Sequence, residues 1–356
     1  MDECIAADLV LPEDEPWMSH AFIHRLATQV SLPYRRPPDG VSRITRRNGS
    51  VSVTLSTANE DGILPYGKYP RLFSLWATTM VKTDNPCWDP ETGILDLGST
   101  FREFLRMIQV RVGGRQMRSV KPQLEHLFDS TYTISNSDES TSDAVLIHVS
   151  DRYHLDWLRN EPQEQGLFRN SVHLTPAYAA MLMDSPVPVD LHVIAQLNKP
   201  MALDVYWWLT RRFSYLHKRQ TIPWSLLHQQ FAPDTVLRSF KQTFRKAVAE
   251  VVAAYPEAKI TCGKDYVTLY PSATSVPTTS QVRHAERLAA KPQSGHDDGR
   301  DGHWFEVAYA GGHGQVYGSL DVFSTVQAQA HLAGDGPVDA CPVCRYDERN
   351  QPLHGA

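Results

Sequence analysis

The stretch that decides the fold reads DTVLRSFKQTFRKAVAEVVAAYP, residues 234–256. Its apolar residues recur at steps of three and four, which is the period of an amphipathic α-helix. The apolar side of this helix is expected to hold Leu237, Phe240, Phe244, Val248 and Val251. Asp234 or Thr235 is placed to cap the helix at its start, and Tyr255-Pro256 ends it. Residues 234–256 are therefore predicted to form one long helix with a single buried side.

The segments around this helix predict a winged helix, which is three helices followed by a β-hairpin. A first helix begins near Pro200, with Asn198 as its cap, and a short second helix runs from Pro223 to Phe231. Beyond the long helix, two alternating segments flank the turn Gly263-Lys264-Asp265. Those two strands are expected at Ile260–Cys262 and Val267–Leu269.

The same order of elements occurs earlier in the chain, with no evident sequence repeat. Helices are predicted at Arg71–Lys82 and Thr100–Val110, and a third helix reaches Phe128. Pro122 lies inside the expected third helix, where proline breaks or kinks, so that helix is expected to begin only around Lys121. A hairpin follows, formed by Thr131–Ser135 and Ala144–Ser150.

The predicted fold class is α+β, mostly helical, with two tandem winged-helix domains. Residues 1–60 are expected to be an irregular lead-in with a short helix near Ser19–Gln29. Residues 61–175 form the first domain with its connecting strands, residues 176–271 form the second, and residues 272–356 form a flexible linker and tail. Between the domains and in the tail, further elements are expected at Ser171–Leu174 (strand), Pro176–Met183 and Pro188–Leu197 (helices), and residues 303–332 (an appended element).

Composition and charge narrow the class of protein. Hydrophobic residues make up 42% of the 356 residues, which is enough for a buried core. No apolar run approaches the roughly 18 residues that a membrane span needs, residues 1–8 are acidic where a secretory signal is basic, and the five cysteines form no disulfide framework. We therefore expect a soluble intracellular protein with no membrane contact.

The charge is distributed unevenly along the chain. The net charge is −5, yet residues 200–271 hold ten Lys/Arg against five Asp/Glu. An acidic beginning and an acidic end flank this basic block, as in a nucleic-acid-binding protein with solvating tails. The charge distribution thus favours a nucleic acid as the partner.

The polar side of the long helix carries the candidate DNA-binding residues. In a helix-turn-helix the side opposite the core lies in the major groove, where such side chains contact base edges and phosphates. On this helix the set is Arg238, Ser239, Lys241, Gln242, Arg245 and Lys246. Lys264 at the hairpin tip is placed to touch the DNA backbone. The alternative is a solvated basic face on a core helix.

The first predicted domain offers a weaker set of DNA-binding candidates. These are Arg111, Arg115, Arg118 and Lys121. Because Pro122 interrupts this segment, the domain is as well explained by phosphate contacts, or by contact with another protomer, as by the reading of bases.

Motifs of enzymes and cofactor sites are absent from the sequence. A rolling-circle nuclease needs a His-x-His pair, and a helicase needs G-x-x-x-x-G-K-[ST]; neither occurs. Cys341 and Cys344 form a single pair of zinc ligands, whereas a structural zinc site needs four. The expectation is a protein without enzymatic activity or a cofactor, in which Cys341 and Cys344 are weak metal candidates.

Three motifs resemble the RepA family of plasmid replication initiators. They are LPYGKYPRL at 64–72, DSPVPVDL at 184–191 and MALDVYWWL at 201–209, and the resemblance continues through Ile222-Pro-Trp224 to the hairpin. It covers roughly residues 20 to 272 and implies paired winged helices. The region beyond Ser272 lies outside it.

The resemblance implies a function. Such proteins bind direct repeats at a plasmid origin, open adjacent AT-rich DNA and recruit the host replicative helicase and initiator proteins. They also interconvert between monomer and dimer. The resemblance further implies a cytoplasmic bacterial protein associated with the nucleoid or a plasmid. A winged-helix transcriptional regulator is the alternative interpretation: an initiator requires several direct repeats, whereas a repressor usually requires one palindrome.

Overall fold

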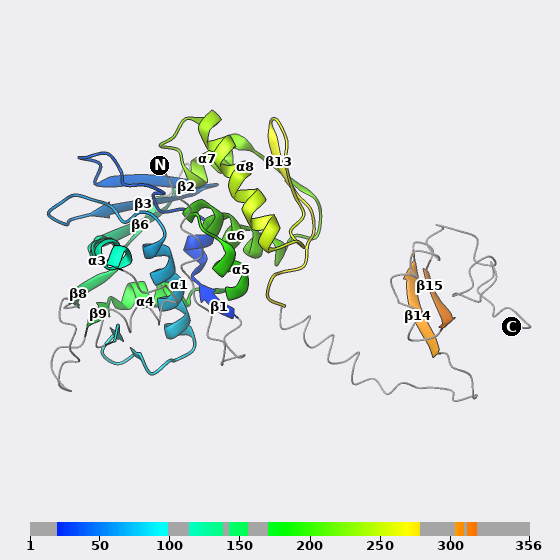
Figure 1. Ribbon diagram of the computed structural model, residues 1–356, viewed down its shortest axis with the longest axis horizontal. Coiled ribbons are helices and arrows are strands. Elements are labelled where there is room, and N and C mark those ends of the chain that lie inside the picture. Colours follow the sequence, from blue (N-terminus) through cyan, green and yellow to red (C-terminus); the bar gives the residue numbers. More distant parts are fainter. Residues whose placement is uncertain are drawn as a thin grey trace, which may run out of the picture. The chain divides into compact units, whose positions relative to one another are not determined.

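The computed structural model describes residues 20–98, 114–137, 142–155, 170–277, 303–309 and 312–318. The chain divides into two compact units, Met1–Thr278 and Thr279–Ala356. Figure 1 shows helices packed on small sheets in the first unit and a two-stranded hairpin in the second. Among the described residues, strands hold nearly as many residues as helices do. The fold is therefore mixed α and β, and helices hold only a small excess of residues over strands in these ranges.

We call the part of unit 1 before helix α6 (Pro200–Phe213) its first half and the part from α6 onward its second half. A four-stranded antiparallel sheet with the order β2-β3-β6-β7 lies in the first half. Its strands are Arg43–Asn48, Val51–Thr57, Ser130–Ser137 and Ser142–His148. Successive side chains of a strand point to opposite faces. One face carries buried Val53, Leu55, Tyr132 and Ile147, and the other is rich in serine and threonine. The sheet therefore has one core face and one polar face.

Two helices of this half share the core with the sheet. Helix α1 spans Tyr69–Lys82, as the sequence predicts, and α3 spans Gly114–Phe128. Phe73 of α1 and Phe128 of α3 pack edge to face, with ring centroids 5.1 Å apart. Helix α3 runs through Pro122, so the expected start around Lys121 is wrong. The lost hydrogen bond is offset by the burial of residues on both sides of the proline, namely Val120, Leu124 and Leu127.

The predicted irregular lead-in is instead part of the folded unit. Strand β1 (His20–Ile23) pairs with β10 (Val187–Asp190), and the 3-10 helix η1 (Arg25–Thr28) follows β1. Strands β2 and β3 belong to the four-stranded sheet. Short alternating segments such as Val51–Thr57 are stable only when a partner strand covers their edge, and β6 supplies that partner from 73 residues or more along the chain. Strand β1 therefore has no local signal, whereas the two-residue turn Gly49-Ser50 between β2 and β3 is a hairpin signal that the sequence analysis missed.

The remaining elements of the first half are short. A second sheet has the order β4-β5-β9-β8, with strands Trp88–Asp89, Ile94–Asp96, Ser171–Leu174 and Ser150–His154. Strand β9 and helix α4 (Pro176–Met183) lie where the sequence predicts them. The helix expected at 188–197 is shorter, because Val187–Asp190 is taken by β10 and α5 covers only Leu191–Gln196.

The second half of unit 1 follows the predicted order of elements. Helix α6 (Pro200–Phe213) leads to strand β11 (Gln220–Pro223), helix α7 (Trp224–Phe231) and helix α8 (Leu237–Ala254). Strands β12 (Ile260–Cys262) and β13 (Tyr266–Leu269) then form a hairpin, and β11 adds to it in the order β11-β13-β12. Helices α6 and α8 pack together, and α7 packs against α8.

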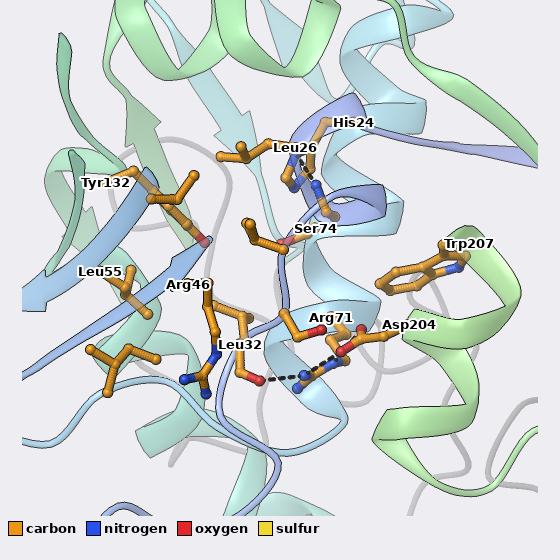
Figure 2. Close-up of a pocket in the computed structure, with 15 residues that line it drawn as sticks. His24, Leu26, Leu32, Arg46, Leu55, Arg71, Ser74, Tyr132, Asp204 and Trp207 are labelled. Atoms are coloured by element: carbon orange, nitrogen blue, oxygen red, sulfur yellow. Dashed lines mark hydrogen bonds and ion pairs between the residues drawn. The ribbon is translucent and has the colours of Figure 1, made fainter. Parts of the chain in front are cut away.

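A buried ion pair joins the two halves. Arg71 of α1 donates through Nε and Nη2 to the two carboxylate oxygens of Asp204 of α6, at 2.8 Å each. Its remaining N–H groups donate to the carbonyls of Leu32, Pro33 and Gly67. Figure 2 shows Arg71 and Asp204 facing each other beside the Leu32 carbonyl. Every guanidinium donor of Arg71 is thus satisfied, which a buried charge requires.

A small cavity adjoins this ion pair (Figure 2). Its volume is about 30 Å³, and residues of η1, β2, β3, α1 and α6 line it. A volume of this size holds about one water molecule. The cavity is therefore a gap in the packing of the joint and is too small for a cofactor.

Two further predictions concern residues 100–110 and the chain beyond residue 271. The helix expected at Thr100–Val110 lies outside the described residues. Beyond residue 271, where a flexible linker is predicted, the chain stays attached to unit 1: the Ser272 hydroxyl accepts from the Lys259 amide at 3.0 Å, and Ser275 contacts Tyr206 at 2.7 Å. Further on, β14 (His303–Tyr309) and β15 (Gly312–Gly318) form an antiparallel hairpin within the predicted tail.

Candidate nucleic-acid interface

Helix α8 has one buried side and one exposed side, as the sequence predicts. The buried side includes Phe240, Phe244, Val248 and Val251. Phe244 packs against the rings of Trp224, Trp208 and Phe231 with centroid distances of 5.6, 6.1 and 5.3 Å. The exposed side includes Arg238, Ser239, Gln242, Arg245 and Lys246. Aromatic packing on one side therefore fixes which side chains of α8 reach solvent.

Two of the predicted DNA-binding cations contact the hairpin turn. Lys241 Nζ donates to the carbonyl of Lys264 at 3.0 Å, and Arg245 Nη2 donates to the carbonyl of Gly263 at 2.8 Å. Both cations also lie over the ring of Trp224, at 5.6 Å and 5.0 Å from its centroid. These two side chains hold the hairpin against α8, a role that the sequence analysis does not assign to them.

Trp224 completes the attachment of the hairpin. Its indole Nε1 donates to the carbonyl of Gly263 at 3.2 Å, and its backbone amide donates to the carbonyl of Asp265. The Trp224 side chain is itself buried against Phe240 and Phe244. All three carbonyls of the turn 263–265 therefore accept hydrogen bonds from α7 or α8. The turn is organised before any ligand binds.

The other candidates on this surface are unpartnered. Within the described ranges, no hydrogen bond or ion pair engages the side chains of Arg238, Ser239, Gln242, Lys246 and Lys264, and all five are exposed. Arg238 lies in the first turn of α8, where a helix in the major groove reaches deepest. We name this set the reading face.

The turn between α7 and α8 is also held in place. Asp234 pairs with Arg46 of β2 at 2.7 Å, and His228 Nε2 contacts the carbonyl of Thr235 at 2.7 Å. The predicted caps Asp234 and Thr235 are wrong: the N-cap is Val236, and no side chain caps the helix. Asp234 instead serves the tertiary contact to Arg46, whose pKa is lowered by burial and raised in part by Asp234.

The weaker set of the first half is only partly described. Arg111 lies outside the described residues. Arg115 and Arg118 fall in the N-terminal part of α3, of which the backbone is described. Lys121 is half-buried, with its Nζ 3.8 Å from Glu125 of the same helix. Burial raises the pKa of Glu125, and Lys121 opposes that shift.

Metal binding finds no support in the described parts of the chain. No group of three or more His, Cys, Asp or Glu side chains there could hold a metal ion. Cys341 and Cys344 lie outside the described residues. No helix within the described ranges is long and apolar enough to cross a lipid bilayer.

Sequence reasoning missed the residues that organise the reading face. Trp224 stands directly after Pro223 and reads as an ordinary core residue, and Arg46 lies in the supposed lead-in. A signal for Trp224 exists in the sequence: a tryptophan in the second helix and two cations on the third can form a cation–π contact. No such signal exists for Arg46, because its partner Asp234 is 188 residues away.

Comparison with known families identifies part of the chain. Residues 64–225 match the family model described as plasmid encoded RepA protein. The predicted resemblance to RepA-type replication initiators is thereby confirmed over these residues. The match ends at the first turn of α7, so it includes Arg71 and Asp204 but not α8 or its hairpin.

Individual proteins give shorter or more distant matches. A protein of Bifidobacterium longum (strain NCC 2705), described as a probable replication protein rep, is 39% identical over 69 residues, which are 19% of this chain. The matched region spans about a fifth (22%) of that relative's length. A crystal structure of RctB domains 2-3 covers 69% of this chain and 96% of its own, with 12% identity and a TM-score of 0.41. A second, of domain 2 and domain 3 of RctB, covers 71% and 97%, with 10% identity and a TM-score of 0.43.

Proposed function

We propose that this protein initiates plasmid replication by binding repeats in double-stranded DNA at the origin through the reading face of α8. The observation that carries the proposal is the exposed, unpartnered set Arg238, Ser239, Gln242, Lys246 and Lys264 beside a prearranged hairpin. Cations held on a rigid surface without internal partners favour an external polyanion. The match of residues 64–225 to the RepA family supports the replication role.

The second half of unit 1 acts in this proposal as a winged helix. Its element order, helix, strand, two helices and hairpin, supports this assignment. Helix α8 enters the major groove, and the hairpin with Lys264 contacts the adjacent backbone. Arg238 and Gln242 are the candidates for base contacts, since arginine binds guanine and glutamine binds adenine with two hydrogen bonds each. Lys241 and Arg245 position the hairpin.

The first half takes part as a second module, built around the β2-β3-β6-β7 sheet with α1 and α3. Arg115, Arg118 and Lys121 of α3 are its candidates for contacts to phosphates or to a second protomer. Opening of AT-rich DNA, recruitment of the host helicase and initiator proteins, and a monomer–dimer equilibrium complete the proposed activity. Each follows from the family resemblance, and none depends on a catalytic residue.

The test combines plasmid maintenance with binding. The gene is supplied in trans to a plasmid that carries its flanking DNA but lacks the gene, and retention is counted without selection. We expect maintenance with the unchanged gene and loss with a gene carrying Arg238→Ala. Footprinting of the same flanking DNA is expected to show several protected direct repeats. A single protected palindrome without plasmid maintenance would instead identify a transcriptional regulator.

A further inference from the structure

Two apolar side chains stand exposed at the start of α8. Val236, the N-cap residue, is 72% exposed, and Leu237 is 37% exposed. The apolar side chains on the buried side of α8, such as Phe240 and Phe244, are at most 8% exposed. Val236 and Leu237 thus lie at the end of the helix that the proposed function places deepest in the groove.

The backbone at this point is fixed, so the exposure is not that of a loose loop. The Val236 carbonyl accepts from the Phe240 amide at 2.9 Å, and His228 holds the preceding carbonyl of Thr235 at 2.7 Å. Asp234 is tied to Arg46 at 2.7 Å. With contacts on both sides, the side chain of Val236 stays directed outward.

Helix stability does not explain a valine at this position. Ser, Thr, Asp and Asn are preferred at an N-cap because their side chains accept a hydrogen bond from a free amide of the first turn. Valine makes no such bond, and α8 has no side-chain cap. The N-cap therefore carries an apolar side chain that does not stabilise the helix. This favours a contact between that side chain and a group outside the fold.

The surrounding charges restrict what that external group is. Arg238 follows two residues after Val236, and Lys246 and Lys264 share the reading face, all without partners in the described part of the chain. The occupant is therefore a polyanion that offers an apolar group at base level. Among base edges in the major groove, thymine alone presents such a group, its C5-methyl.

We propose that Val236 and Leu237 contact thymine C5-methyl groups in the bound repeat and so help to specify its sequence. The inference rests on the proposed DNA binding and names a base that the repeat must contain near the N-terminus of α8. Arg238 supplies hydrogen bonds to a neighbouring base, while the two apolar side chains select T over C, which lacks the methyl group.

The experiment replaces thymine by deoxyuracil, one position at a time, in a duplex carrying the footprinted repeat. Uracil pairs as thymine does and lacks only the methyl group. For the unchanged full-length protein we expect about a fourfold loss of affinity at one or two positions, the value for burial of one methyl-sized group, and no loss elsewhere. Fluorescence anisotropy measures each Kd at one salt concentration.

Variants assign the effect to the side chain. Val236→Ala is expected to bind the thymine duplex about fourfold more weakly and to show no further loss at the sensitive position. Val236→Ser keeps the helix start by supplying a cap, so it stays folded and also loses sensitivity to uracil. The matched control is Val145→Ala, because Val145 is also exposed, at 58%, but lies on β7. This control should retain the uracil effect in full.

The possible failures are distinguishable. If the protein binds the repeat but no uracil position weakens binding, or if Val236→Ala and Val236→Ser retain the uracil effect, the thymine contact is wrong and the proposed function stands. If the protein binds no repeat from its flanking DNA, the proposed function fails and the thymine contact fails with it.

Discussion

Removing one partner of the buried Arg71–Asp204 pair should uncouple the two halves of unit 1. Both side chains are at most 3% exposed, and Arg71 also satisfies three backbone carbonyls on two further segments. Asp204→Leu leaves a guanidinium charge in the core without its counter-charge. Arg71→Met leaves a buried carboxylate and the carbonyls of Leu32 and Gly67 without donors, while the Pro33 carbonyl still accepts from the Gly67 amide. Each variant therefore keeps a polar group in the core that water cannot reach.

The expected loss is large. Breaking a buried pair from one side costs about 3–5 kcal/mol in the free energy of unfolding. Arg71→Met should lie at or above the upper end, because each unsatisfied carbonyl adds about 1–3 kcal/mol. The double variant Arg71→Met/Asp204→Leu removes both charges, and its loss should be smaller than the sum of the single losses by about 2 kcal/mol or more. Urea unfolding followed by tryptophan fluorescence measures all three, since Trp207 lines the adjoining cavity.

A surface pair provides the control. Arg25 and Asp184 form an ion pair in which both side chains are more than 40% exposed, so Arg25→Met should cost less than about 1 kcal/mol. Single losses below about 1 kcal/mol at Arg71 and Asp204, with an additive double variant, would show that this pair does not hold the joint.

Four further outcomes are expected. Burial lowers the pKa of His24 from 6.5 to about 4. The neutral imidazole therefore stabilises the fold fully above pH 6.5, and about 3 kcal/mol of the free energy of unfolding is lost as the pH falls through 4. Unfolding measured at pH 7 and pH 4.5 should show a smaller loss of stability for His24→Asn than for the unchanged protein. Lys241→Ala loosens the hairpin and should therefore weaken binding to cognate and to scrambled DNA about equally. Arg238→Ala should cost about 1–3 kcal/mol of binding free energy on cognate DNA alone. If the two variants have the same ratio of cognate to scrambled affinity, this division of roles is wrong. If both modules contact phosphates, log Kd should change with log salt at a slope of magnitude about 6 to 10, and a salt-independent Kd would exclude DNA binding. A chain ending at residue 278 should keep the melting temperature and DNA affinity of unit 1, whereas one ending at residue 271 should melt lower because it lacks the Ser275 contact to Tyr206.

Local periodicity was sufficient for the helices and for the hairpin of the second half. Helix α1, helix α4 and strand β9 occupy their expected residues, and α8 buries the expected side. These elements repeat apolar residues at a fixed step, which is a property of a short window of sequence. The motifs at 64–72 and 201–209 likewise pointed to a resemblance to RepA proteins, and both lie inside the segment that the RepA family model matches.

Local rules failed where a distant partner decides the outcome. Pro122 should break α3, yet burial of Val120 and Leu124 on both sides keeps the helix intact. Strand β1 pairs with β10, and β3 pairs on one edge with β6, both far along the chain, whereas the local β2-β3 hairpin was simply overlooked. A short stretch of sequence shows the proline or the strand, but it does not include the distant residues that pack against it and stabilise it.

The sequence by itself determined that α8 is a basic amphipathic helix in a RepA-like chain, since side-chain type and helical step are local properties. Tertiary structure alone decided which of its cations have partners within the fold and which do not. Lys241 and Arg245 share the exposed side with Arg238, but they bond to the turn at 263–264 and lie over Trp224. Which cations are bonded depends on how α7 and the hairpin pack against α8. Such packing brings together donors and acceptors from separate segments, and the residue spacing along one helix cannot predict those contacts.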